Sequence, residues 1–156
     1  ISALTMPKFL SWRSHVFFNE KTYNDTTNFI YTSYTGPKFS SDVRGRVWEG
    51  ATVTTVALQV AFHMGFDQVI LIGVDHNFAS KGDANKTITS EGDDPNHFMP
   101  NYFGKGVRWQ LPDLDTSEVG YLMAREAFKQ AGREVIDATV GGKLTVFPKV
   151  DYNSLF

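Results

Sequence analysis

Three polar residues, Asp75, His76 and Asn77, directly follow the apolar segment QVILIGV at 68–74. In open α/β sheets, ligands bind beyond the carboxyl ends of the strands, where loops carry polar side chains. An aspartate that follows a buried strand keeps its charge only with partners. We therefore expect Asp75 to accept hydrogen bonds from loop amides or from residues 52–54. The pattern predicts the floor of a ligand cleft, with Asp75 as a catalytic or binding carboxylate.

A second candidate segment is EGATVT at 49–54, which precedes a predicted helix. Small residues at a helix start let backbone amides approach a phosphate or a sugar closely, which favours a nucleotide-like ligand. The predicted binding residues at this end of the sheet are Gly50, Ala51, Thr52, Thr54, His76 and Asn77. A simple helix N-cap at 50–52 is an equally good interpretation of the glycine.

The segment TVGGKLTVF at 139–147 follows the last predicted strand. Gly141 and Gly142 could form an anion-binding nest with Lys143 as counter-charge, and we include both glycines among the binding residues. The spacing does not match a P-loop, and a tight turn is the alternative.

Acidic residues and a histidine gather in SEGDDPNHF at 90–98, where Glu91, Asp93, Asp94 and His97 lie close in sequence. Such carboxylates suit Mg²⁺, although the EF-hand pattern is absent and a solvated acidic turn is the alternative. His97 is a candidate general base near neutral pH, or a residue whose hydrogen bonds hold the loop.

The elements that must position these residues follow from hydrophobic periodicity. The spacing of apolar residues predicts a helix at 52–64 that ends at Gly65, and a second helix at 116–131 capped by Asp115 with Glu118. The predicted strands are 12–18, 28–34, 68–74 and 133–138, with irregular chain at 35–50. The continuous apolar run at 68–74 is typical of a central parallel strand that is covered on both faces.

Residues 76–114 lack a clear period, and their aromatic side chains favour an ordered lid over a linker. We expect this lid to fold over the carboxyl end of strand 68–74 and to bring His97 within reach of Asp75 or His76. The fold class is thus α/β: one Rossmann-like domain at 1–156, with a mostly parallel sheet and flanking helices.

Composition excludes several classes of protein. The 15 basic and 17 acidic residues give a net charge of −2 without a basic stripe, so nucleic acid is not an expected partner. There is no cysteine for thiol chemistry or zinc ligation, and no apolar stretch approaches the roughly 18 residues of a membrane span. A cytoplasmic location is expected, and homo-oligomerisation stays open.

Four segments carry a resemblance to a known family: 49–78, SEGDDPNHF at 90–98, LPDLDTSE at 111–118 and ATVGGKLTVFPKVDY at 138–152. From about Trp12 onward, the chain resembles the bacterial branch of the 6-hydroxymethylpterin diphosphokinase-like and motility-associated-factor glycosyltransferase family. It is more distantly similar to bacterial lipooligosaccharide sialyltransferases, which use CMP-sialic acid and have a Rossmann-like fold. That similarity places Asp75 and Asn77 near the nucleotide phosphate and residues 52–54 in the nucleotide loop.

The chain departs from these families in two places. Family members carry a glycine-rich GNGPS-like loop ahead of the region present here, which implies an N-terminally truncated domain with an incomplete site. The sialyltransferases place a catalytic histidine where this chain has Leu111, Pro112 and Asp113, so His97 is the nearest substitute.

The resemblance implies a glycosyltransferase that moves a sugar from a CMP-linked or similar donor to an acceptor hydroxyl and requires no cofactor. One alternative is a diphosphotransferase that acts on a pterin-like substrate and holds Mg²⁺ with Asp75 or with Asp93 and Asp94. Another is a noncatalytic piece that contributes half of a nucleotide cleft.

Overall fold

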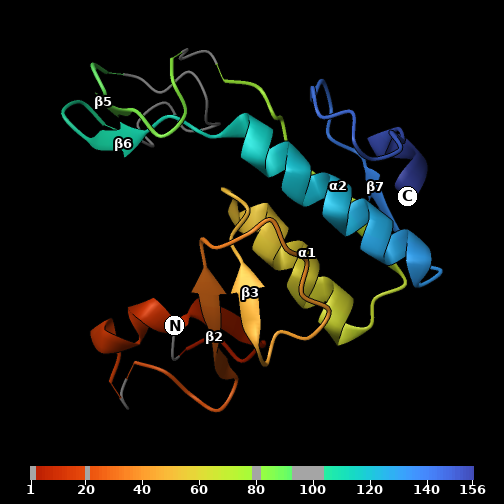
Figure 1. The fold of residues 1–156 in the computed structure, drawn as a ribbon, viewed down its shortest axis with the longest axis horizontal. Coiled ribbons are helices and arrows are strands. Elements are labelled where there is room, and N and C mark those ends of the chain that lie inside the picture. Colours follow the sequence, from red (N-terminus) through yellow and green to blue (C-terminus); the bar gives the residue numbers. More distant parts are fainter. Residues whose placement is uncertain (1–2, 20–21, 79–81, 93–103) are drawn as a thin grey trace.

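A computed structural model describes residues 3–19, 22–78, 82–92 and 104–156. The predicted base His97 and the acidic pair Asp93 and Asp94 lie outside these residues, and so does the expected approach of His97 to Asp75. The elements in chain order are β1 (Lys8–Ser11), η1 (Trp12–Phe17), β2 (Thr27–Ser33), β3 (Arg46–Trp48), α1 (Val53–Met64), β4 (Gln68–Leu71), β5 (Thr87–Thr89), β6 (Arg108–Gln110), α2 (Leu114–Gln130), β7 (Glu134–Asp137) and η2 (Tyr152–Leu155). The predicted α/β class with parallel strands is confirmed (Figure 1).

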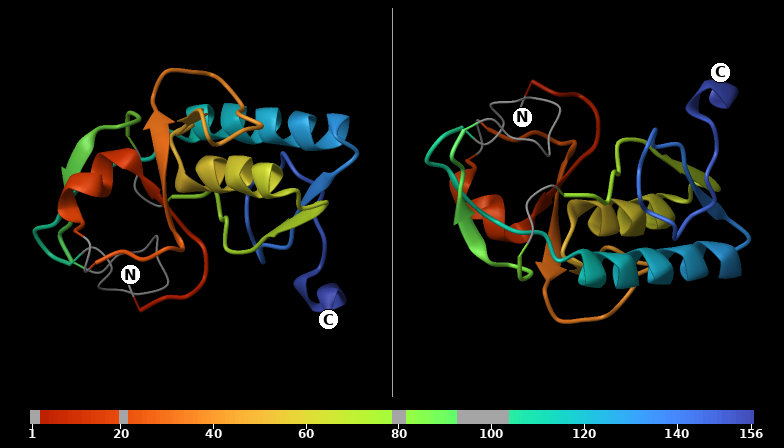
Figure 2. Two further views of the ribbon diagram at one scale, coloured as in Figure 1. Left: turned by 90° about the horizontal axis from the view of Figure 1, so that it is seen from below. Right: turned by 90° about the horizontal axis from the view of Figure 1, so that it is seen from above.

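The strands form two small parallel sheets and one antiparallel hairpin. β2 lies between β1 and β3 in the first sheet, β4 pairs with β7 in the second, and β5 pairs with β6 in the hairpin. Helices α1 and α2 lie side by side and begin at the same end, and the hairpin lies beyond that end (Figures 1 and 2). The carboxyl ends of β2, β3 and β4 lead into the loops that meet there.

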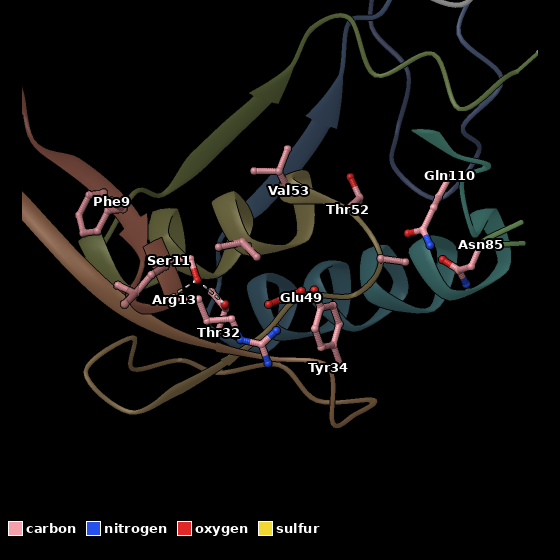
Figure 3. Close-up of a pocket in the computed structure, with 13 residues that line it drawn as sticks. Phe9, Ser11, Arg13, Thr32, Tyr34, Glu49, Thr52, Val53, Asn85 and Gln110 are labelled. Atoms are coloured by element: carbon pink, nitrogen blue, oxygen red, sulfur yellow. Dashed lines mark hydrogen bonds between the residues drawn. The ribbon is translucent and has the colours of Figure 1, made fainter. Parts of the chain in front are cut away.

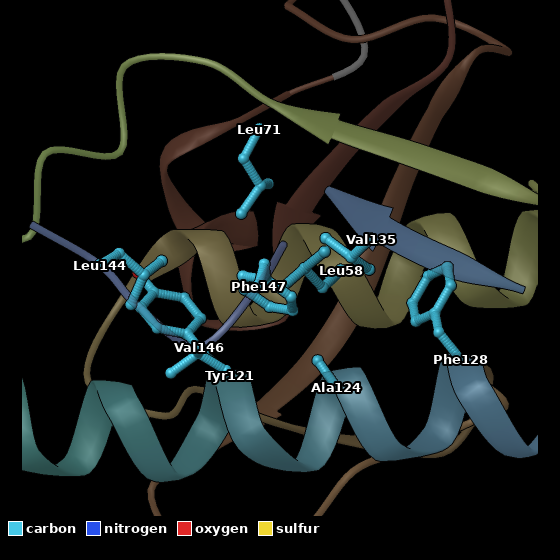
Figure 4. Close-up of a cluster of buried hydrophobic side chains, with 9 residues drawn as sticks. All are labelled: Leu58, Leu71, Tyr121, Ala124, Phe128, Val135, Leu144, Val146 and Phe147. Carbon is cyan, nitrogen blue, oxygen red and sulfur yellow. The ribbon is translucent and has the colours of Figure 1, made fainter. Parts of the chain in front are cut away.

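Helix α1 is the element shared by two hydrophobic cores. Leu58 packs with α2, β4 and β7 in the larger core, whereas Val60 packs with β2 and β3 in the smaller one. The larger core comprises Leu58, Leu71, Tyr121, Ala124, Phe128, Val135, Leu144, Val146 and Phe147 (Figure 4). A helix that packs on both sides must carry apolar residues around most of its circumference, which explains its nearly continuous apolar sequence.

The predicted ends of α1 are confirmed. The Thr52 hydroxyl accepts a hydrogen bond from the Thr54 N–H at 3.3 Å, and Gly65 ends the helix in the left-handed region at φ 86°. A glycine adopts this conformation without the Cβ clash that other residues incur, so the chain can turn directly into β4.

Helix α2 begins two residues earlier than predicted, and its cap is a different aspartate from the expected Asp115. Asp113 accepts hydrogen bonds from the Thr116 N–H at 2.9 Å and from the Thr116 hydroxyl at 2.8 Å. These bonds lower the pKa of Asp113 against the opposing effect of burial. The prediction of an Asp115 and Glu118 capping pair was wrong because Asp115 already lies inside the first turn.

Replacing Asp113 with alanine should lower the free energy of unfolding by about 1 kcal/mol, because the Thr116 N–H loses its acceptor. Urea unfolding at neutral pH measures the change. Asp113→Asn, which retains a capping oxygen, is the control and should recover most of the loss. Equal losses in both variants would show that the carboxylate charge matters more than the cap.

The predicted parallel pairing of strands 68–74 and 133–138 is confirmed by the register of β4 against β7. Two further expectations for this strand were wrong. Among the residues described, β4 pairs with β7 alone, and one face is open, with Ile70 37% and Ile72 58% exposed. An apolar run shows that side chains can be buried, but coverage of both faces also needs neighbouring elements, and the helices cover only one face here.

The N-terminal region differs from prediction in two respects. Residues 12–17, predicted as a strand, form a 3₁₀ helix in which the Trp12 and His15 rings stack with centroids 4.2 Å apart. The predicted strand at 28–34 is confirmed as β2, whereas β3 lies in the segment expected to be irregular.

The long segment at 76–114 contains regular structure in its described part. The β5–β6 hairpin is extended by hydrogen bonds from the Asn85 N–H to the Leu111 carbonyl at 2.9 Å and from the Leu111 N–H to the Lys86 carbonyl at 3.0 Å. Within the described ranges, neither α-helix combines the length and apolarity that crossing a bilayer would require.

Candidate functional site

A cleft of about 300 Å³ opens where α1 and α2 begin and β4 ends. It is lined by Ala51, Thr52 and Thr54 from the start of α1; by Asp75, His76, Asn77 and Phe78 from the loop after β4; and by Leu114, Ser117 and Tyr121 from α2. Residues predicted from two separate segments are therefore neighbours. The expectation that polar residues after the carboxyl end of a parallel strand line a cleft located Asp75, His76 and Asn77 correctly.

The turn before α1 is shaped by two consecutive left-handed residues, Gly50 at φ 55° and Ala51 at φ 57°. A Cβ on residue 50 would come within 2.6 Å of the Thr55 Cγ2, so only glycine fits there. The Thr52 N–H donates to the Glu49 carbonyl at 3.2 Å, which closes the turn. Gly50 itself lines a neighbouring hollow of about 510 Å³ rather than the cleft.

The loop after β4 presents its side chains differently from expectation. His76 adopts φ 50° and packs its ring edge-on to Tyr121, with centroids 5.9 Å apart. The Asp75 side chain is exposed and makes no hydrogen bond within the described part of the chain. The prediction that loop amides or residues 52–54 donate hydrogen bonds to this carboxylate was wrong. Asp75 lies beyond the end of β4, where water can solvate the charge.

Gly141 and Gly142 support this loop from outside the cleft. The Lys143 N–H donates to the Asp75 carbonyl at 2.7 Å, so it is not available for an anion nest. Gly142 allows close packing, because a Cβ there would lie 3.3 Å from the Val74 carbonyl oxygen. The arrangement fits the tight-turn alternative, with Gly141 in the left-handed region at φ 71°.

A larger hollow of about 540 Å³, which we call the β2 hollow, lies on the other side of the α1 start. Its lining comprises Phe9, Ser11, Arg13, Ile30, Thr32, Tyr34, Glu49, Ala51, Thr52, Val53, Val56, Asn85 and Gln110. It shares Ala51 and Thr52 with the cleft, so the two spaces flank the same turn. Figure 3 shows the residues that line the β2 hollow.

Most polar residues of the β2 hollow were missed in the sequence. Tyr34 follows the end of β2 and Glu49 follows the end of β3, so the carboxyl-end rule that selected Asp75 applies to both. Arg13 and Gln110 had no comparable signal, because they come from a 3₁₀ helix and a hairpin that were not predicted.

In the described part of the chain, no three histidine or acidic side chains gather closely enough to hold a metal ion. Comparison of the chain with protein-family models, curated proteins and solved structures found no match. The chemistry of the site therefore rests on its geometry.

Proposed function

We propose that the protein is a glycosyltransferase with a Rossmann-like fold, which transfers a sugar from a CMP-linked or similar nucleotide donor to an acceptor hydroxyl. The observation that carries the proposal is the cleft in which the starts of α1 and α2 meet the Asp75–Asn77 loop. The N-terminus of α1 favours a bound anion, because its dipole points a positive end toward the cleft, whereas the Asp113 carboxylate already caps α2. The resemblance of the sequence to nucleotide-sugar transferases agrees with this proposal.

Each lining segment has a role in the proposed reaction. The positive end of the α1 dipole, with the Thr52 hydroxyl and the Asn77 side-chain amide, would stabilise the donor phosphate. The acceptor oxygen forms a bond to the anomeric carbon while the bond from that carbon to the phosphate oxygen breaks. The phosphate keeps the electron pair, and a general base takes the hydroxyl proton. We propose His97 as that base.

Asp75 is proposed to bind the nucleotide through its exposed carboxylate, which can accept charge-assisted hydrogen bonds from ribose hydroxyls. Asp75→Asn should weaken CMP binding about tenfold while the free energy of unfolding changes by less than about 0.5 kcal/mol. Calorimetry with CMP and urea unfolding measure the two quantities.

Asp67→Asn is the matched control, because Asp67 is an exposed aspartate just before β4, at the opposite end of that strand from the cleft. It should leave CMP binding unchanged. Stability lost by several kcal/mol in Asp75→Asn with unchanged affinity would identify Asp75 as a loop anchor and refute its binding role. The titrations are repeated with EDTA and with Mg²⁺; binding of ATP in place of CMP, and only with Mg²⁺, would favour the diphosphotransferase instead.

A further inference from the structure

We infer that the β2 hollow is a carbohydrate-binding subsite that holds a sugar ring of the acceptor. This inference rests on the proposed function for its link to catalysis. The location of the hollow, its aromatic residue and its hydrogen-bonding groups each support it.

The location suits an acceptor. Ala51 and Thr52 line both the β2 hollow and the cleft, so only the turn at the start of α1 separates the two spaces. A sugar in the hollow would reach the donor across this turn, as a transfer between two bound molecules requires. The volume of about 540 Å³ falls within the range of small-molecule sites.

The hollow is apolar at one end and polar at the other. Phe9 packs with Ile30 and Val56 and forms an apolar end. Asn85 and Gln110 from the hairpin segment lie at the opposite end from Phe9 (Figure 3). A sugar ring has the same character, since its C–H groups are apolar and its hydroxyls surround them. Polar groups that are placed around an apolar surface are typical of sites that orient a small molecule.

Tyr34 supplies an aromatic surface that is 72% exposed. The Arg13 guanidinium lies 4.7 Å from the centre of its ring and orients it by a cation–π contact. The Tyr34 ring also borders the hollow, where the C–H face of a sugar can pack on it. Tyr34 lies next to Glu49 in the close-up view (Figure 3). A single sugar ring can therefore pack on Tyr34 and donate a hydrogen bond to Glu49.

The polar groups match hydroxyls better than a phosphate or another anion. Glu49 only accepts hydrogen bonds when ionised, Arg13 only donates, and the amides of Asn85 and Gln110 can do both. A hydroxyl also donates and accepts, so it can pair with each of these groups.

The test uses NMR of the full chain with methyl glycosides of galactose, glucose and N-acetylglucosamine as probes. At least one glycoside should shift the side-chain amide signals of Asn85 and Gln110, with a dissociation constant on the order of 1 mM. Tyr34→Ala and Gln110→Ala should each weaken this binding about tenfold, because each removes one of the two kinds of contact. Both side chains are exposed, so the variants are expected to fold.

Tyr31→Ala is the matched control. Tyr31 lies on β2, three residues before Tyr34, is 52% exposed and has Arg46 over its ring at 5.2 Å, but it does not line the hollow. The Tyr31→Ala variant should bind the glycosides with the same affinity as the unmodified chain does. Equal weakening in Tyr31→Ala and Tyr34→Ala would overturn the assignment.

Failure of this inference can be distinguished from failure of the proposed function by adding CMP in a separate titration. If CMP shifts the Thr52 and Asn77 signals while no glycoside shifts Gln110, the carbohydrate subsite is refuted and the nucleotide cleft stands. If a glycoside binds and CMP does not, the subsite stands without the proposed transferase. If CMP itself shifts Gln110 and the glycosides do not, the hollow is a nucleobase pocket and the inference is wrong.

Discussion

Replacing Gln59 with leucine should lower the free energy of unfolding by about 3 kcal/mol, because the change leaves several buried backbone groups without partners. Gln59 is fully buried in α1. Its Nε2 donates to the Trp48 carbonyl at 2.8 Å and its Oε1 accepts from the Ser40 N–H at 2.9 Å. One side chain thus joins α1 to β3 and to the loop before β3. Leucine has a similar volume, so the loss reports the missing hydrogen bonds rather than a cavity.

Urea unfolding followed by circular dichroism measures this loss. Gln130→Leu is the control, because Gln130 is exposed on α2 and its side chain, within the described ranges, bonds only to Glu126 of the same helix, at 2.8 Å. It should change stability by less than about 0.5 kcal/mol. A loss below about 1 kcal/mol in Gln59→Leu would mean that the freed backbone groups find water or new partners.

The parts of the fold that were predicted correctly are those whose signal is local and repeated. Helix α1 combines apolar residues at helical spacing with a cap at Thr52 and a stop at Gly65, so several independent features agree on its bounds. β2, β4 and β7 carry β-branched and apolar residues between turn signals. The parallel pairing of β4 with β7 agrees with the helix that lies between these two strands in the sequence.

The parts that were missed depend on contacts with residues distant in sequence or on a choice between similar local signals. The segment at 12–17 has the composition of a strand, yet the Ser11 hydroxyl accepts from the Arg13 N–H and starts a 3₁₀ turn. β3 is three residues long and is held by its pairing with β2, which no local pattern reveals. Asp113 and Asp115 are both plausible caps, and only the backbone geometry selects Asp113.

The candidate site divides in the same way. The side chains of the cleft were predictable because Asp75–Asn77 and Ala51–Thr54 directly adjoin predicted elements. The β2 hollow draws Arg13, Tyr34, Glu49 and Gln110 from four separate elements or their ends, and their proximity exists only in three dimensions. The sequence therefore predicted the residues of the cleft but not those of the β2 hollow.

The second prediction with a large expected effect on stability concerns the ion pair between Asp137 and Lys149, which lies behind the cleft. The Asp137 carboxylate is fully buried, and its Oδ2 accepts from the Lys149 ammonium at 2.6 Å. Its Oδ1 accepts from the Thr139 N–H at 2.8 Å, and the Thr139 hydroxyl in turn accepts from the Val74 N–H at 3.0 Å. The chain of contacts thus connects the C-terminal segment to the residue before Asp75.

These contacts determine whether the free energy of unfolding rises or falls with pH. Burial raises the pKa of Asp137, but the hydrogen bonds from Lys149 and Thr139 outweigh it and hold the pKa below its usual value. A depressed folded-state pKa gives stability that is present above the unfolded-state pKa of about 3.9 and is lost as the pH falls through the folded-state value. Acid should therefore weaken this part of the unmodified protein.

Lys149→Met should cost about 2 kcal/mol at pH 7, because among the described residues it leaves the buried charge with Thr139 alone as a hydrogen-bond partner. The effect is smaller than for a fully enclosed pair, since the Lys149 side chain is 39% exposed and water screens it. Without the ammonium, the hydrogen bond from Lys149 no longer lowers the folded-state pKa of Asp137, so this pKa is higher than in the unmodified chain. Asp137 then contributes less stability above the unfolded-state pKa, and the two proteins differ less as the pH falls through the folded-state values.

Urea unfolding at a series of pH values from about 3 to 7 follows both proteins across this window. The gap in stability between them should widen as the pH rises. The double variant Asp137→Asn with Lys149→Met removes the uncompensated charge and should recover much of the loss at pH 7, while Lys38→Met at an exposed site should have little effect. A loss in Lys149→Met that stays constant over the whole pH range would assign the role of Lys149 to the packing of its aliphatic stem, because packing does not titrate.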